Sequence, residues 1–250
     1  MLTLSALLQR RPKLDTPGAA ETWFHDIAVR LLGACRLRAA GSVNRLVEIE
    51  FYFDSEEHPD PFTHRHAEQR TSGRWYFHRI GASYRGGSFK GFDLTFGDGL
   101  AHGGILIRSL ETPEGRLVVG PSLCVDYLLT TTGSSAVAAL ASAIGGRHAA
   151  DADSPLQLID GWNPNVDVKL FRSARVGLSL KRLNDAIAVD RLSRPYRFLT
   201  EPRRVTKGRP ELIDALLSAG HSLEDVRRLT GSPMKAIKAR HSSPPMRNGL

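Results

Sequence analysis

The clearest pattern near the start of the chain is a set of apolar residues at helical spacing. They recur every three or four positions, as one buried face of a helix requires. These residues are Trp23, Phe24, Ile27, Ala28, Leu31 and Leu32. Thr16 and Pro17 are suited to begin such a helix, and Gly33 is suited to end it. We therefore expect a helix here, preceded by a loosely ordered leader at residues 1–15.

Residues 45–53 instead alternate between apolar and polar side chains. Alternation with a period of two predicts a strand with one buried face. The predicted buried face holds Val47, Ile49 and Phe51, and the opposite face holds Glu48, Glu50 and Tyr52. Two glutamates on one strand face, flanked by apolar residues, are therefore the first candidates for a functional site.

Shorter patterns complete a mixed fold. Apolar or aromatic runs bounded by turn residues predict strands, at 75–78, 92–96, 103–110, 167–171, 175–178 and 194–199. Helices are expected at 120–129 and 136–144, with a loop at 145–164. Together these elements predict an α+β fold, a single mixed domain over residues 16–202 with a curved, mainly antiparallel sheet flanked by helices.

After Pro202 the pattern becomes purely helical. An amphipathic helix is predicted at 210–219, and Ser222 followed by Asp225 resembles a capping box that opens a second helix. A third helix begins after Ser232, so the three resemble a helix-turn-helix. We expect a small basic helical appendage at 203–241 and a flexible tail at 242–250. A DNA-contacting role and a plain packing role for this appendage remain equally open.

The charge of the chain is concentrated in this C-terminal part. The formal net charge is +8, and residues 203–250 contribute ten basic and four acidic side chains. A basic excess of this kind favours an anionic partner, either nucleic acid or a membrane surface. Lys235, Lys238 and Arg240 on the third helix are the candidate contacts to DNA.

Composition excludes several other classes. Only Cys35 and Cys124 are present, so a disulfide framework is excluded and both are expected to be buried thiols in a reducing compartment. The short apolar N-terminus is followed by its charges, the wrong order for a secretory signal, and no apolar run is long enough for a membrane helix. We expect a cytoplasmic, nucleoid-associated or nuclear protein that is not secreted.

Seven short segments, in chain order, resemble the alkyladenine (3-methyladenine) DNA glycosylase family. The most informative is Val-Glu-Ile-Glu-Phe-Tyr at 47–52, which is similar to the family's central strand. The others are Ile-Ala-Val-Arg-Leu-Leu-Gly at 27–33, Asp-Pro-Phe-Thr-His at 60–64, Leu-Ile-Arg-Ser-Leu-Glu at 106–111, Gly-Pro-Ser-Leu-Cys at 120–124, Arg-Val-Gly-Leu at 175–178 and Arg-Phe-Leu at 197–199. The resemblance therefore covers roughly residues 20–200.

This resemblance implies a base-excising enzyme with Glu50 as the carboxylate that activates water. Tyr52 and His64 would line a pocket for a flipped base, and Glu48 would share the face of Glu50 and raise its pKa. Arg108 would contact the pocket or a phosphate, or else form a buried ion pair with a carboxylate such as Glu48. Glu50 is expected to face a hollow wide enough for an extruded base.

The family inserts an aromatic residue into DNA from a tyrosine-rich hairpin, which here is replaced by residues 89–97. Phe92 and Phe96 are the candidate pocket wall and wedge, although both would equally suit the core of a strand. Asp93 would either read the base or cap a turn. Arg85 and Lys90, on a glycine-rich stretch, would approach the DNA backbone or lie on a flexible hairpin.

Other chemistries are less well supported. His58, Asp60, His64 and His66 could suggest a metal site, but no fixed third ligand accompanies them, so neither a metal nor a cofactor is expected. No lysine lies in the segment around Glu50 to form a Schiff base with the sugar. This favours a monofunctional hydrolase acting on an alkylated or otherwise modified base in double-stranded DNA, without strand cleavage and without an obligate protein partner.

Two alternatives remain open beside this hypothesis. The replaced tyrosines, the shortened hairpin and the basic helices suit a catalytically altered DNA-binding protein on the same fold. An enzyme acting on a ligand other than DNA through the same pocket is the third hypothesis, favoured by a surface without a positive stripe beside Glu50.

Overall fold

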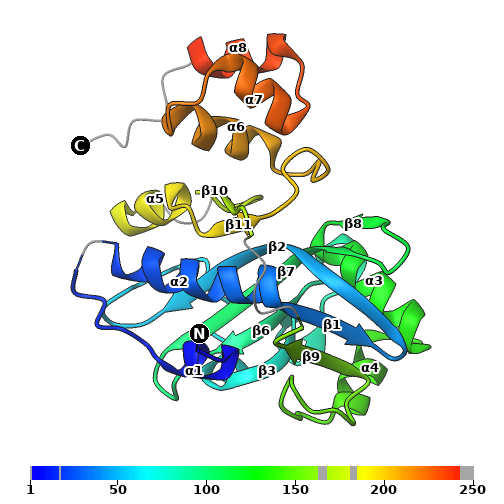
Figure 1. Cartoon of the computed structure of the whole chain (residues 1–250). Helices are drawn as coiled ribbons and strands as arrows, with labels where there is room; N and C mark the ends of the chain where they lie inside the picture. The colour runs from blue at the N-terminus through cyan, green and yellow to red at the C-terminus, as the bar shows by residue number, and fades with distance from the viewer. Residues whose placement is uncertain (1, 17, 163–167, 181–184, 243–250) are drawn as a thin grey trace.

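The computed structural model describes residues 2–16, 18–162, 168–180 and 185–242. Within these residues nine strands form one open sheet in which every neighbouring pair is antiparallel, with the order β10-β11-β2-β7-β6-β3 and with β1, β8 and β9 attached at its sides. Helices flank this sheet, and the last three helices form a group at one end (Figure 1). The predicted α+β fold class is confirmed.

The bounds of the elements are as follows. The strands are β1 (Cys35–Ala39), β2 (Ser42–Asp54), β3 (Ser72–Phe77), β4 (Arg79–Ile80), β5 (Ser83–Tyr84), β6 (Phe92–Phe96), β7 (His102–Glu111), β8 (Leu117–Val119), β9 (Leu156–Asp160), β10 (Phe171–Ser173) and β11 (Arg197–Leu199). The helices are α1 (Leu4–Gln9), α2 (Ala19–Val29), α3 (Pro121–Thr132), α4 (Val137–Ile144), α5 (Ala186–Ser193), α6 (Arg209–Ser218), α7 (Leu223–Thr230) and α8 (Met234–Ser242). Short 3-10 turns occupy Ala67–Arg70 and Gly87–Phe89, and a π-turn at Arg30–Ala34 follows α2.

Helix α2 lies across the sheet and closes the main core (Figure 1). The six apolar residues that predicted it are all buried, and the ring of Phe24 stacks on Phe51 of β2 with centroids 4.6 Å apart. The helix begins later than predicted because Gly18 precedes it with φ of 84°, a conformation that glycine adopts without strain; Pro17 lies outside the described residues.

The predicted loose leader is wrong. Residues Leu4–Gln9 form α1, in which Leu4 and Leu8 are buried against the main core. The amide of Leu4 donates a 2.8 Å hydrogen bond to Asp160 at the end of β9. Leucines spaced four residues apart bury one side of even a short helix, and this contact orders the segment.

Strand β2 departs from simple alternation at Val47. The pairing of β2 with β7 shifts between Leu46 and Glu48 and again between Glu48 and Ile49. Leu46 and Ile49 therefore both reach the main core, whereas Val47 joins a second core cluster with Leu199. The prediction that Val47 shares a face with Ile49 is wrong, because a bulge adds one residue to the alternation.

The remaining differences concern short elements. Strands β1 and β9 and helix α5 were not predicted, and residues 175–178 form a bend rather than a strand. The predicted strand at 167–171 falls partly outside the described residues, and its described part begins β10 only at Phe171. Within the described residues no single helix is long and apolar enough to cross a membrane, although the pair α3 and α4, bent by 66°, meets the length and composition criteria together.

The three C-terminal helices form as predicted, with the side chain of Ser222 capping α7 by accepting from the amide of Asp225 at 3.1 Å. They share the second core cluster with the sheet. This cluster contains Val47, Phe171, Leu199, Val205, Leu212, Ile213, Leu216, Val226 and Ile237. Arg197 of β11 also donates to the backbone carbonyls of Lys207 and Gly208, at 2.9 and 2.8 Å.

Candidate functional site: a buried carboxylate–arginine cluster

Glu50 lies in the middle of β2, and its side chain is wholly inaccessible to solvent. One oxygen accepts from the amide of Val176 at 2.7 Å. The other accepts from the hydroxyl of Tyr52 at 2.9 Å and from Nη1 of Arg108 at 3.3 Å. A carboxylate has about four acceptor positions, so three donors leave about one position without a donor.

Glu48 is held even more firmly, two residues away. Its Oε1 atom accepts from Nε of Arg197 at 2.6 Å and from Nε of Arg108 at 3.1 Å, and its Oε2 atom accepts from the hydroxyl of Ser109. The side chains of Glu48 and Arg197 have no accessible surface. The interpretation of Arg108 as a buried ion pair with Glu48 is confirmed, and Arg108 pairs with Glu50 as well.

The electrostatics of the cluster raise the pKa values of Tyr52 and Arg108. Burial and the charge of Glu50 raise the pKa of Tyr52 well above its ordinary value, so this residue stays a hydroxyl donor. Burial alone lowers the pKa of Arg108, but the charges of Glu50 and Glu48 outweigh burial and raise that pKa. Arg175 stacks over the ring of Tyr52 at 4.5 Å and forms a buried pair with Asp60 at 2.6 Å.

Asp93 lies on the same face of the sheet as Glu50. Both residues are paired in register with Leu106 of β7, from its two sides. Directly paired residues point to the same side, and adjacent strands are about 4.8 Å apart, so the Cα atoms of Glu50 and Asp93 are separated by roughly 10 Å. Two of the predicted residues from distant segments therefore share one face.

Asp93 neither caps a turn nor faces solvent. Its carboxylate binds Nε2 of His78 at 2.7 Å and accepts from Nε2 of Gln69 at 3.0 Å. Asp93 and Gln69 cover Gly104 of β7, where an added Cβ would lie 2.5 Å from the Asp93 carboxylate and 2.6 Å from Nε2 of Gln69. The space beside Tyr52, which is paired with Gly104, is therefore occupied by protein.

His64 is on this face but does not contact Glu50. Its ring lies 4.3 Å from the ring of His78 and within 3.5 Å of the Tyr76 hydroxyl. Partial desolvation of the ring and the neighbouring His78 lower the pKa of His64 to about 4, although the residue keeps exposed surface. At neutral pH His64 is uncharged and can accept a hydrogen bond.

The predictions for Phe92 and Phe96 as pocket wall and wedge are wrong, because both point into the main core. Phe92 is inaccessible and stacks near Phe77, with centroids 5.8 Å apart. Phe96 is 1% exposed and packs against Trp23 and Phe53. Since alternate residues of β6 face opposite ways, placing Asp93 on the carboxylate face forces its even-numbered neighbours into the core.

Within residues 85–101 the exposed large apolar side chains are Phe89 and Leu100, at 71% and 87% exposure. Leu100 lies on the turn between β6 and β7, where its amide and that of Ala101 donate to Asp98. Asp98 in turn binds Arg11 at 2.8 Å, so this turn is fixed while its apolar tip extends into solvent. Neither residue was predicted, because both lie outside the strands whose alternating pattern carries the sequence signal.

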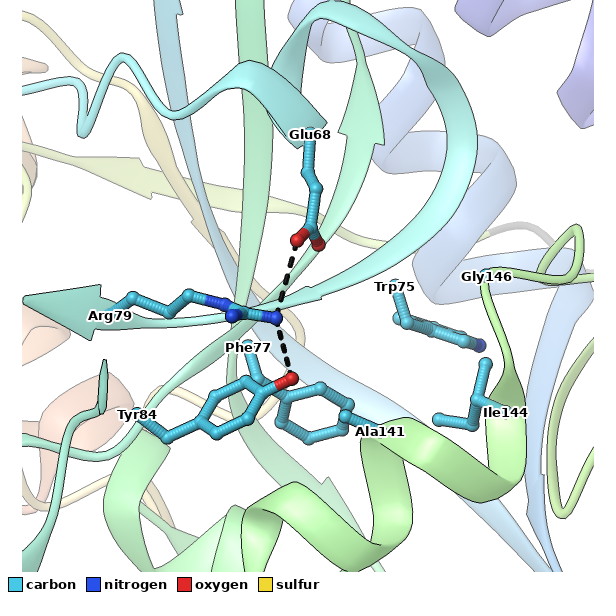
Figure 2. Close-up of a pocket in the computed structure, with 8 residues that line it drawn as sticks. All are labelled: Glu68, Trp75, Phe77, Arg79, Tyr84, Ala141, Ile144 and Gly146. Atoms are coloured by element: carbon cyan, nitrogen blue, oxygen red, sulfur yellow. Dashed lines mark hydrogen bonds and ion pairs between the residues drawn. The ribbon is translucent and has the colours of Figure 1, made fainter. Parts of the chain in front are cut away.

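A pocket of about 150 Å³ lies beside β3, and neither Glu48 nor Glu50 lines it. Figure 2 shows Arg79 beneath Glu68, with dashed contacts to Glu68 and to the hydroxyl of Tyr84, and with Trp75 and Ile144 across the pocket. Arg79 donates to Tyr84 at 2.5 Å and lies 3.3 Å from Glu68. None of the predicted site residues lines this pocket, so the expected hollow beside Glu50 is not found there.

The basic side chains predicted to contact DNA differ in whether they are exposed or already bound to other residues. Lys235 and Lys238 are exposed on α8, whereas Arg240 is bound to Asp214 of α6 at 2.5 Å. Lys90 pairs with Asp126 of α3. The predicted contact Arg85 is half-buried and donates to the carbonyl of Arg79 at 3.3 Å.

The residues of the possible metal site have other partners: His64 and His66 pack against the ring of Tyr76. His58 binds the Phe53 carbonyl and the hydroxyl of Tyr196, and Asp60 is held by Arg175. Within the part of the chain that the structure describes, no group of three His, Cys, Asp or Glu side chains could hold a metal ion. Both cysteines are free and buried, as predicted.

Arg197 and Val176 belong to the carboxylate cluster but were not predicted as members of it. Both lie in segments that were noted for their resemblance, at 197–199 and 175–178, but the sequence does not say which partner each would meet. His78 and Gln69 were also missed. Their only sequence signal was a polar residue beside an aromatic strand, which is too common to single out.

Fold and site together define a mixed α+β protein with a buried carboxylate–arginine cluster on one sheet face. No known family model matches the chain. A stretch of 124 residues is 40% identical to an uncharacterized protein, L759, of Acanthamoeba polyphaga mimivirus. The match covers 44% of this chain and 57% of that relative, so the chain spans little more than half of the relative's length.

Proposed function

We propose that this protein is a monofunctional DNA glycosylase that hydrolyses the N-glycosidic bond of a flipped alkylated or otherwise modified base. The observation that carries the proposal is the orientation of the Glu50 carboxylate by three donors from three segments, Tyr52, Arg108 and Val176. These donors fix the carboxylate and leave about one acceptor position, which suits the binding of one water molecule.

The chemistry follows from that geometry. As the bond between the sugar carbon and the base breaks, its electron pair leaves with the base and positive charge develops on the sugar. Glu50 would orient a water whose oxygen bonds to the sugar carbon, accept the proton of that water, and stabilise the positive charge. Arg108 and Tyr52 would hold the carboxylate in place during this step.

Access to Glu50 requires a change on binding DNA. In the free protein the carboxylate is inaccessible, and the Gln69–Asp93 hydrogen bond fills the space over Gly104. Tyr52 and Val176 are half-buried, so the cluster lies just beneath the surface at these two residues. A flipped base would have to displace this cover, at a cost of a few kcal/mol that contacts with DNA must offset.

The test is release of free base from a panel of damaged duplexes, measured by mass spectrometry. We expect Glu50→Gln to lower the rate of release by about a hundredfold or more, while the far-ultraviolet circular dichroism spectrum is unchanged. Glu114→Gln, on the exposed turn after β7, is the matched control and should match the wild type. Equal release by the wild type and Glu50→Gln would remove Glu50 from the role proposed for it.

A second candidate is a DNA-binding protein on this fold without excision chemistry. The observation that favours it is the complete burial of Glu50 in ion pairs, together with the core positions of Phe92 and Phe96. Steeply salt-dependent duplex binding, without base release from any duplex of the panel, would support this candidate over the glycosylase.

A further inference from the structure

The turn between α7 and α8 borders an open hollow on the surface of the C-terminal helices. Its volume is about 500 Å³. The residues that line it are Arg203, Glu224, Arg227, Arg228, Gly231, Ser232 and Pro233. Three arginines and one glutamate give the hollow an excess of positive charge, so its chemistry favours an anion.

Ser232 is the unusual member of this lining. The residue is only 4% exposed, and its hydroxyl has no hydrogen-bond partner among the described residues. Its amide donates to the hydroxyl of Thr230 at 3.2 Å, which fixes the backbone of the turn. Buried hydroxyls are normally paired because an unpaired one destabilises the fold. Ser232 lines the hollow, so a ligand there that the side chain turns to meet would supply the missing partner.

The start of α8 adds donors at the same place. The helix runs from Met234 to Ser242, and the first amides of a helix have no carbonyl partner within it. These amides and the helix dipole attract anions to the N-terminus. Ser232 and Pro233 both line the hollow and immediately precede Met234, so α8 begins next to this space.

Arg203 supplies the charge that is most available. It is exposed, and its side chain has no ion-pair partner within the part of the chain described. Gly231 has φ of 67°, and a Cβ added there would lie 3.4 Å from Cγ of Arg203, so the arginine side chain lies along the turn. Arg227 forms a long ion pair, with its Nη1 atom 3.6 Å from Oε2 of Glu224. The side chain of Glu224 is 74% exposed and is free to move aside.

We propose that this hollow binds a phosphate group of the DNA backbone. The Ser232 hydroxyl and the first amides of α8 are the hydrogen-bond donors, and Arg203 is the neutralising cation. The inference rests on the proposed binding of DNA but not on excision at Glu50. A contact of this kind is independent of base sequence, since the phosphate group is the same at every position of the DNA backbone.

The experiment measures binding of the full chain to an undamaged duplex by fluorescence anisotropy over a range of salt concentrations. Ser232→Ala should weaken binding about tenfold, the loss of one hydrogen bond to a charged group, without lowering the melting temperature. Arg203→Ala should weaken binding and reduce the slope of log K against log salt by about 0.9. Arg10→Ala is the control, because Arg10 ends α1 at the opposite end of the molecule from α8 (Figure 1).

A second arm uses inorganic phosphate alone, followed by the amide signals of residues 231–235 in a 15N-labelled sample. Saturable shifts in the wild type that are lost in the Ser232→Ala, Arg203→Ala double variant support an anion site. If the wild type binds the duplex and both single variants bind it as tightly, the hollow does not hold a DNA phosphate, whatever inorganic phosphate does. If the wild type binds neither duplex nor phosphate, the proposals of DNA binding and of this anion site both fail. If phosphate shifts these amide signals but the wild type does not bind the duplex, the anion site stands and DNA is not the source of its phosphate group.

Discussion

Nε of Arg197 lies 2.6 Å from Oε1 of Glu48, and neither side chain has any surface accessible to solvent. Arg197 uses its other nitrogen atoms on Ser173 and on the carbonyls of Lys207 and Gly208. A buried pair of this kind contributes little beyond an apolar pair, but removal of one partner leaves an uncompensated charge. Glu48 is thus held by two arginines and a hydroxyl, whereas Glu50 accepts from only one arginine, together with a hydroxyl and a backbone amide.

We expect Arg197→Met to lower the free energy of unfolding by about 3–5 kcal/mol, because Glu48 would lose its closest cation while staying buried. Urea unfolding followed by circular dichroism measures the change. Arg10→Met, at an exposed position, is the matched control and should change stability by less than about 0.5 kcal/mol. The role assigned to the pair is wrong if the two variants unfold alike, or if adding Glu48→Gln to Arg197→Met restores nothing.

Phe96→Ala should behave as a core substitution. Phe96 is 1% exposed and packs against Trp23, Phe24 and Phe53, so its removal should cost about 3–5 kcal/mol of stability. Phe89→Ala removes the same ring from a position that is 71% exposed and should cost under about 0.5 kcal/mol. Thermal melting of the two variants tests this, and a stable Phe96→Ala protein would return Phe96 to the surface role that the sequence suggested.

His64 makes the stability of the protein depend on pH. Its folded-state pKa is lowered from 6.5 to about 4, so between these values the unfolded chain binds more protons than the folded one. The free energy of unfolding therefore falls as the pH drops through this window. His64→Gln should flatten the decline, measured by urea unfolding between pH 7 and 4. Parallel curves for the two proteins would contradict the lowered pKa.

Lys235 and Lys238 should contribute to DNA binding through charge alone. Both are exposed on α8, so Lys235→Ala with Lys238→Ala should leave stability within about 0.5 kcal/mol of the wild type. If each contacts one phosphate, the slope of log K against log salt should fall by about 1.8. Arg240→Ala serves as a comparison, since Arg240 is already bound to Asp214. An unchanged salt slope in the double variant would place the DNA elsewhere.

Much of the fold could be predicted because long periodic patterns dominate it. The helix around Trp23 and Phe24, the strand around Glu50 and the three C-terminal helices all form, since each buries a continuous apolar face. The short strands β1 and β9 were missed because five residues carry too little pattern. Their stability comes from pairing with each other and with β2, which no local sequence reveals.

The site was predictable in its members more than in its geometry. The sequence placed Glu48, Glu50 and Tyr52 on one strand face, and the structure joins them to Arg108. It did not indicate that Glu50 would be covered, because the cover comes from Val176, far along the chain. The sequence also did not show which side chains of β6 face the core. Phe92 and Asp93 were both candidates for the pocket, yet neighbouring residues of a strand face opposite ways.

The position of Arg197 between Glu48 and the carbonyls of Lys207 and Gly208 has a consequence for cooperativity. The same guanidinium neutralises Glu48 of the sheet and holds the chain where it enters α6. Neither the sheet nor the C-terminal helices therefore keep all their hydrogen bonds when the other part unfolds. The C-terminal helices and the sheet should therefore unfold together, as one peak in a calorimetric scan. For the same reason a protease would find no intact fragment to release by cutting between them.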